Sequence, residues 1–237
     1  MLTCTILLVC GACTLFFYIR EKIVCCSVKA VLLKSLVSVL FVSVAVCAWY
    51  ASLQNRNPGI LGPFVILGLL FGLLGDIWLD LKYVFPEKDV HFTYAGFLVF
   101  GIGHVLYIAG MLLQFGRGVP VGRIIAPILL GVALSFGNAV LEKPMKLQFG
   151  RMKAIVIAYG VFLFSAVLLA GSLALYYSWQ VTSLNLIFLG GILFALSDLV
   201  LSGTYFGVGK DRPVHIILNY LSYYPAQFLI ALSPFFL

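Results

Sequence analysis

Runs of about 20 apolar residues recur along the whole chain and constrain its fold more than any other feature. Each run is long enough to cross about 30 Å of hydrocarbon as an α-helix. Only 10% of the 237 residues are charged, whereas 63% are hydrophobic. A water-soluble domain needs more polar residues to cover its surface. The sequence therefore predicts an all-α, polytopic membrane protein and excludes a soluble globule, a disordered chain and a disulfide scaffold.

Short polar or turn segments divide the apolar sequence into eight predicted transmembrane helices. The positive flank of the first helix follows its apolar run, so we expect a retained helix instead of a signal peptide. Because the connections are short, the chain is expected to form one transmembrane domain, residues 1–237. The predicted helices lie near residues 2–19, 31–53, 60–84, 92–114, 121–141, 155–177, 184–205 and 214–236.

The basic residues are distributed unevenly between the two sides of the predicted bundle. Of the 15 Lys and Arg residues, 12 lie beside the odd-numbered connections and 3 beside the even-numbered ones. The positive-inside rule then places the odd connections in the cytoplasm and both termini outside it. Basic residues spread over four connections do not form a nucleic-acid patch, so no nucleic-acid partner is expected. Either a bacterial inner membrane or the endoplasmic reticulum fits this pattern.

The chain resembles itself at a shift of 122 residues. The segment GLLFGLLGDIWL (Gly68–Leu79) aligns with GGILFALSDLVL (Gly190–Leu201), and Asp76 then falls on Asp198. The two copies lie in the third and the seventh predicted helices, four positions apart, so both copies run in the same direction through the membrane. This pattern indicates a parallel 4+4 repeat with halves 1–120 and 121–237.

Three of the eight acidic residues lie inside predicted helices: Asp76, Asp80 and Asp198. A charged carboxylate in the bilayer costs about 2.5–3.5 kcal/mol on insertion scales, so such residues usually have a function. For Asp76 and Asp198 the alternative is a structural role in interhelical hydrogen bonds. For Asp80 the alternative is a position near the interface, paired with Lys82 or with lipid headgroups.

Further polar residues lie at similar depth in two other predicted helices. His104 and Tyr107 belong to one helical stripe, and Tyr223, Tyr224 and Gln227 surround Pro225 in the last helix. Counted at 1.5 Å per residue, all of these groups lie about 11–20 Å from the cytoplasmic ends of their helices. We therefore expect a buried site that opens toward the cytoplasmic leaflet, although a lone histidine such as His104 is often a packing residue.

Four motifs in this order resemble the YhhN family of membrane proteins, which includes the lysoplasmalogenases. They are Gly75-Asp76, the spacing G-x3-F-x3-H-x2-Y from Gly96 to Tyr107, Ser197-Asp198, and SYYPAQFLIALS (Ser222–Ser233). The chain departs from the family pattern at Gly203-Thr204, where an Asn is common, at Pro225, and in a longer loop at residues 86–91.

This resemblance implies hydrolysis of the vinyl-ether bond of lysoplasmalogens to a fatty aldehyde and a glycerophospho-base. The reaction requires a carboxylic acid that protonates carbon and a second carboxylate that activates water. Burial disfavours the charged form of a carboxyl group, and a second carboxylate nearby adds to this effect. We therefore expect Asp76 and Asp198 to be the catalytic pair. Asp80 and the neighbouring polar residues are expected to bind substrate or water: His104, Tyr107, Tyr223, Tyr224 and Gln227.

Other functions remain open at this stage. Paired intramembrane carboxylates also occur in proton-coupled transporters, and a non-catalytic lipid-binding protein would use them only for stability. No cofactor is expected, and the dispersed histidines lack the spacing of a zinc site. Three basic residues at the cytoplasmic ends are expected mainly as membrane anchors, with phosphate binding as the alternative: Lys82, Lys210 and Arg212.

Overall fold

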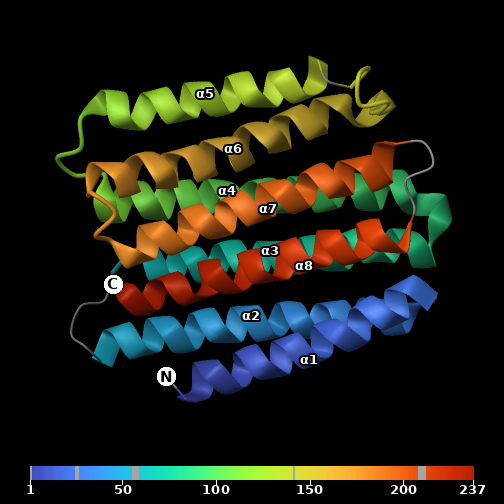
Figure 1. The fold of residues 1–237 in the computed structure, drawn as a ribbon, viewed down its shortest axis with the longest axis horizontal. Helices are drawn as coiled ribbons and strands as arrows, with labels where there is room; N and C mark the ends of the chain where they lie inside the picture. Colours follow the sequence, from blue (N-terminus) through green and yellow to red (C-terminus); the bar gives the residue numbers. More distant parts are fainter. Residues whose placement is uncertain (1, 25–26, 55–58, 141, 208–211) are drawn as a thin grey trace.

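The computed structural model describes residues 2–24, 27–54, 59–140, 142–207 and 212–237. Within these residues eight α-helices run side by side along a common direction (Figure 1). Short 3-10 turns, η1 (Pro86–Lys88), η2 (Gly150–Met152) and η3 (Ser233–Phe236), lie between or after them. The helices are α1 (Leu2–Val24), α2 (Val28–Gln54), α3 (Leu61–Val84), α4 (Asp89–Phe115), α5 (Val121–Val140), α6 (Lys153–Tyr176), α7 (Thr182–Phe206) and α8 (Pro213–Leu232).

In the described part of the chain, seven helices, α1 to α7, are long and apolar enough to cross a membrane. Helix α8 carries more polar side chains, and those of Asn219, Tyr223 and Gln227 are buried inside the bundle. Large apolar side chains such as Phe16 and Leu129 are exposed on the outside of the bundle, as lipid contact requires. The prediction of an all-α, multi-pass membrane protein is therefore confirmed. The number of eight membrane crossings stays a prediction.

The ends of the helices differ most from the sequence prediction at α1 and α8. Helix α1 was predicted to end at residue 19 but continues to Val24, because Lys22 points into the bundle and is buried. Helix α8 ends at Leu232, and Pro234 lies in the following 3-10 turn. Because proline lacks a backbone N–H group, a helix ends readily before it.

Packing places α3 against α2, α4 and α8, and α7 against α6 and α8. The proposed repeat pairs α2 with α6, α3 with α7 and α4 with α8. Under this pairing the α2–α3 contact corresponds to α6–α7, and the α4–α6 contact to α8–α2. All four contacts are present. The repeat itself stays a prediction. Both ends of the chain lie at one end of the bundle (Figure 1), and their assignment to the non-cytoplasmic side also stays a prediction.

Helices α3 and α4 approach each other closely where two glycines meet. A Cβ atom added to Gly103 would lie 2.9 Å from the backbone oxygen of Gly68, closer than van der Waals contact allows. Backbone atoms cannot move aside as a flexible side chain can. The absence of a side chain at Gly103 thus sets the distance between α3, which carries Asp76, and α4.

We expect Gly103→Ala to destabilise the bundle by about 1–3 kcal/mol, since the methyl group forces α3 and α4 apart. The matched control is Gly137→Ala in α5, where no atom lies within 4 Å of an added Cβ. Thermal unfolding in detergent, followed by size-exclusion chromatography of the heated samples, compares the two variants. Equal melting temperatures would contradict the close contact between α3 and α4.

Candidate functional site

Asp76 is buried in α3 and is contacted from two neighbouring helices. From α2, Ser38 donates a hydrogen bond to its Oδ2 at 2.6 Å, and Lys34 Nζ lies 3.3 Å from its Oδ1. From α8, the hydroxyl of Tyr223 donates to Oδ2 at 2.8 Å. One ammonium and two hydroxyl groups thus face this carboxylate.

Asp80 lies one turn after Asp76 and belongs to the same buried charge network. Lys22 Nζ is 2.8 Å and Lys34 Nζ 3.4 Å from its Oδ1, and the hydroxyl of Tyr18 donates to Oδ2 at 3.0 Å. Its partners therefore come from α1 and α2, and the alternative of a pair with Lys82 is wrong. The predicted substrate-binding role of Asp80 is not tested by these contacts, which give it a clear structural role.

Asp198 in α7 has different surroundings. Its Oδ2 accepts a hydrogen bond from the hydroxyl of Tyr159 in α6. Among the described residues, no Lys or Arg nitrogen lies within ion-pair distance of Asp198. The two aspartates that the repeat aligns are therefore unequal: Asp76 lies beside Lys34, and Asp198 lies beside a phenol.

One cavity of about 20 Å³, which we call the carboxylate cavity, is lined by both aspartates. A space of about 10–15 Å³ on this measure holds a water molecule, provided that two to four polar groups bind it. The carboxylate cavity thus has room for one water molecule. The polar residues that line it come from five helices: Lys34, Asp76, Tyr159, Asp198, Tyr205, Asn219, Tyr220 and Tyr223.

A second cavity, of about 70 Å³, continues from the first and is mainly apolar; we call it the apolar cavity. It shares Phe97, Tyr159 and Asp198 with the carboxylate cavity and extends between α6 and α7 to Leu163 and Phe164. Its apolar walls suit an aliphatic chain, and Asp198 lies where the two cavities meet. The pair of cavities therefore has room for part of an aliphatic chain on one side of Asp198 and for water on the other.

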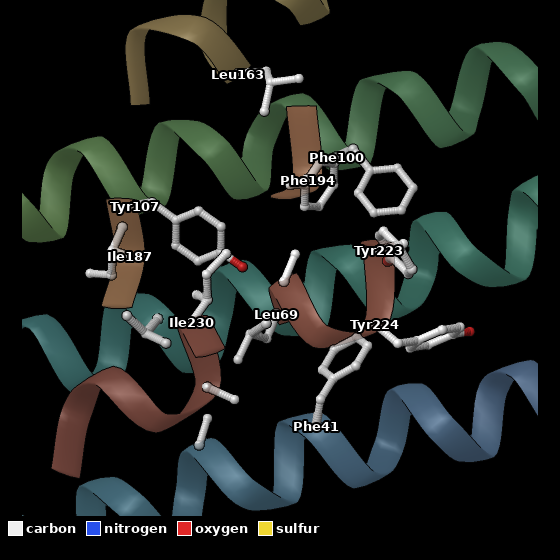
Figure 2. Close-up of a cluster of buried hydrophobic side chains, with 14 of the residues drawn as sticks. Phe41, Leu69, Phe100, Tyr107, Leu163, Ile187, Phe194, Tyr223, Tyr224 and Ile230 are labelled. Carbon is white, nitrogen blue, oxygen red and sulfur yellow. The ribbon is translucent and has the colours of Figure 1, made fainter. Parts of the chain in front are cut away.

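Of the other predicted site residues, Tyr223 lines the carboxylate cavity. Its ring lies 6.2 Å from that of Phe100 and 5.3 Å from that of Phe194 (Figure 2). Tyr224 is buried (Figure 2), and its ring lies 6.3 Å from that of Tyr18 in α1. The structure thus brings Tyr223 to the cavity and directs its neighbour away from it.

Three further predicted residues, His104, Tyr107 and Gln227, are buried but do not line the carboxylate cavity. The ring of His104 packs 5.7 Å from that of Tyr159 and 5.9 Å from that of Tyr107. In the described part of the chain, His104 Nε2 and Gln227 Oε1 have no hydrogen-bond partner. Their roles in binding water or substrate stay predictions.

The sequence prediction missed the groups that contact the aspartates from other helices. Lys34 lies inside the predicted helix 31–53, where a charged side chain is costly and needs a partner. Its position four residues before Ser38 puts both side chains on one face of α2, and this spacing was an available signal. The residues missed as site partners are Tyr18, Lys22, Lys34, Ser38 and Tyr159.

Within the described residues, no three His, Cys, Asp or Glu side chains gather where they would hold a metal ion. Of the basic residues expected near the cytoplasmic ends, Lys82 and Arg212 are described, and Lys210 lies outside the described residues. Comparison with curated proteins and with solved structures found no match. The model of the YhhN family matches residues 30–234, nearly the whole chain, and the protein therefore belongs to the YhhN family.

Proposed function

We propose that this protein is a membrane hydrolase that cleaves the vinyl-ether bond of lysoplasmalogens. The observation that carries the proposal is a single cavity lined by two carboxyl groups, Asp76 and Asp198, which continues into an apolar cavity. The aliphatic chain would occupy the apolar cavity, and water the carboxylate cavity. Membership of the YhhN family is consistent with a membrane protein and compatible with hydrolase activity.

The unequal surroundings of the aspartates assign their roles in this proposal. Asp198 has no cation beside it among the described residues and is the proton donor. Lys34, 3.3 Å from Asp76, favours a carboxylate at that position, where it stabilises a positive charge and accepts a proton from water. Tyr159 and Tyr223 orient the two side chains through their hydroxyl groups.

The reaction then returns both aspartates to their starting states. Asp198 gives its proton to the β-carbon of the vinyl ether, and the oxygen lone pair forms an oxocarbenium ion. Water adds to the cationic carbon while Asp76 takes its proton, which gives a hemiacetal. As the hemiacetal collapses, Asp76 returns that proton to the glycerol oxygen, and Asp198 receives the hemiacetal proton. The products are a fatty aldehyde and the glycerophospho-base.

Purified protein in detergent is expected to release fatty aldehyde from 1-alkenyl-glycerophosphoethanolamine or the choline analogue. In D2O, rapidly trapped aldehyde should carry one deuterium on the carbon next to the carbonyl, because protonation occurs there. Mass spectrometry of the trapped product measures both the amount and the label.

The 1-acyl lysophospholipid of the same chain length is the control substrate. Release of fatty acid from this ester would indicate a lysophospholipase instead. A folded wild-type protein that releases no aldehyde would contradict the proposal and favour the transporter or lipid-binding alternatives.

A further inference from the structure

The α3–α4 and α5–α6 connections lie at the same end of the bundle (Figure 1). Residues at both connections line a third cavity, of about 270 Å³. We call it the end cavity. Two basic residues from different helices line it, Lys82 of α3 and Arg151 of η2. The polar or aromatic residues beside them are Asp89, Thr93, Gln148 and Tyr205.

Lys82 does not extend outward as a membrane anchor would. Its side chain is only 10% exposed, and Nζ lies 3.3 Å from the centre of the Tyr205 ring. An anchoring lysine places its ammonium in the interfacial water. Asp89 holds the same nitrogen at 3.5 Å, but the side chain of Asp89 is 56% exposed, so this ion pair is weak and open to exchange. Lys82 thus presents a charge to the cavity that another anion can bind.

The wall that carries Arg151 is fixed by hydrogen bonds. The N–H of Gln148 donates to the oxygen of Phe206 at 2.8 Å, which ties the α5–α6 connection to the end of α7. Glu142 accepts from Lys153 Nζ at 2.8 Å and from the N–H of Phe149 at 2.9 Å, and these bonds hold the pKa of Glu142 below its usual range. The backbone that carries Arg151 is therefore ordered, and it lies at the rim of the end cavity.

The end cavity adjoins the site of the proposed reaction. Phe149, Tyr205 and Phe206 line both the end cavity and the apolar cavity. Asp198 and Tyr205 are two helical turns apart in α7, about 10 Å along the axis. In a lysophospholipid, the glycerol backbone spans the interval between the ether oxygen and the phosphate. A substrate with its ether at Asp198 thus extends its phosphate toward the end cavity, which Lys82 and Arg151 line.

We propose that the end cavity binds the phosphodiester of the lysophospholipid headgroup, with Lys82 and Arg151 as its ligands. This inference rests on the proposed function for the identity of the lipid. Charge-assisted hydrogen bonds to phosphate oxygens supply the affinity, and the bidentate geometry of arginine supplies the orientation. The site makes the enzyme select a phospholipid over a neutral ether lipid of the same chain length.

Binding of a saturated 1-alkyl-glycerophosphoethanolamine tests the site independently of hydrolysis, because this ether cannot react. We expect Lys82→Gln and Arg151→Gln each to raise its Kd about tenfold or more. Lys82→Arg should retain most of the affinity. Lys29→Gln, at an exposed lysine on the same end of the bundle, should leave the Kd unchanged. Tryptophan fluorescence or thermophoresis in detergent gives these values, and a failed hydrolysis assay does not affect them.

A 1-alkylglycerol of the same chain length lacks the phosphate and serves as the second probe. The Gln variants should bind it as the wild type does, because only the phosphate contact is lost. Equal losses for both probes, or unchanged affinity for the phospholipid, would overturn the proposal. Tighter binding of inorganic phosphate than of the phospholipid, measured by displacement at matched ionic strength, would overturn the lipid headgroup as the natural occupant. Arg151 is exposed, so its variant remains informative if Lys82→Gln does not fold.

Discussion

Replacement of Asp198 by Asn is expected to lower the rate of aldehyde release by about 10²- to 10⁴-fold, the usual contribution of a general acid. The amide has nearly the same shape as the carboxyl group, but it cannot give a proton to the vinyl-ether carbon. Tyr159 can still hydrogen-bond to the amide oxygen, so the fold around α6 and α7 should persist. Initial rates from the wild type and variant, at equal amounts of folded protein, give the ratio.

Two further variants make this result specific. Asp76→Asn should cause a loss in the same range, and the double variant should lose little more than the worse single variant, because the two groups act in one step sequence. Glu87→Gln removes an exposed carboxylate of η1 and should leave the rate unchanged. A folded Asp198→Asn variant with the wild-type rate would exclude this aspartate as the proton donor.

Lys34→Met should have the largest effect on stability, about 3–5 kcal/mol, because it leaves buried charge uncompensated. Lys34 serves Asp76 and Asp80 at once, and its side chain is only 4% exposed. Without it, Asp76 loses its ion-pair partner, and Asp80 keeps only the ammonium of Lys22. Unfolding in mixed micelles at increasing SDS concentration measures the loss of free energy.

The control for this change is Lys29→Met, which breaks the exposed ion pair with Glu21 and should cost less than about 1 kcal/mol. A second test adds Asp76→Asn to Lys34→Met. This pair restores a neutral network of Lys22 and Asp80, so part of the lost stability should return. If the double variant is less stable than Lys34→Met alone, the effect comes from packing and the charge argument fails.

The sequence was sufficient to predict the helices and the two aspartates of the site. The apolar runs are long and their polar breaks are clear, so most helix ends agree closely with the structure. The match between residues 68–79 and 190–201 directed attention to Asp76 and Asp198, which line one cavity. The sequence also predicted the buried face of α4 that carries His104. The spacing of residues along a helix indicates which face is buried, but it does not show which buried side chains line a cavity.

The sequence was insufficient to predict the partners of these aspartates, because pairing depends on how distant helices pack. Lys22 and Lys34 looked like residues that set the membrane orientation, and nothing local distinguishes them from anchors such as Lys29. Their partner Asp80 lies 58 and 46 residues further along the chain. Tyr159 was missed for a related reason: phenols are common in membrane helices, and only the α6–α7 contact gives this one its acceptor.

The buried lysines have a consequence for the order in which the protein is made. Helices α1 and α2 leave the ribosome before α3, so Lys22 and Lys34 enter the translocation machinery when neither aspartate yet exists. We expect the ammonium groups of Lys22 and Lys34 to stay at the aqueous surface or in the insertion channel until the third helix is made. We therefore expect α1 and α2 to settle fully into lipid only after α3 has supplied Asp76 and Asp80 as partners of the two lysines.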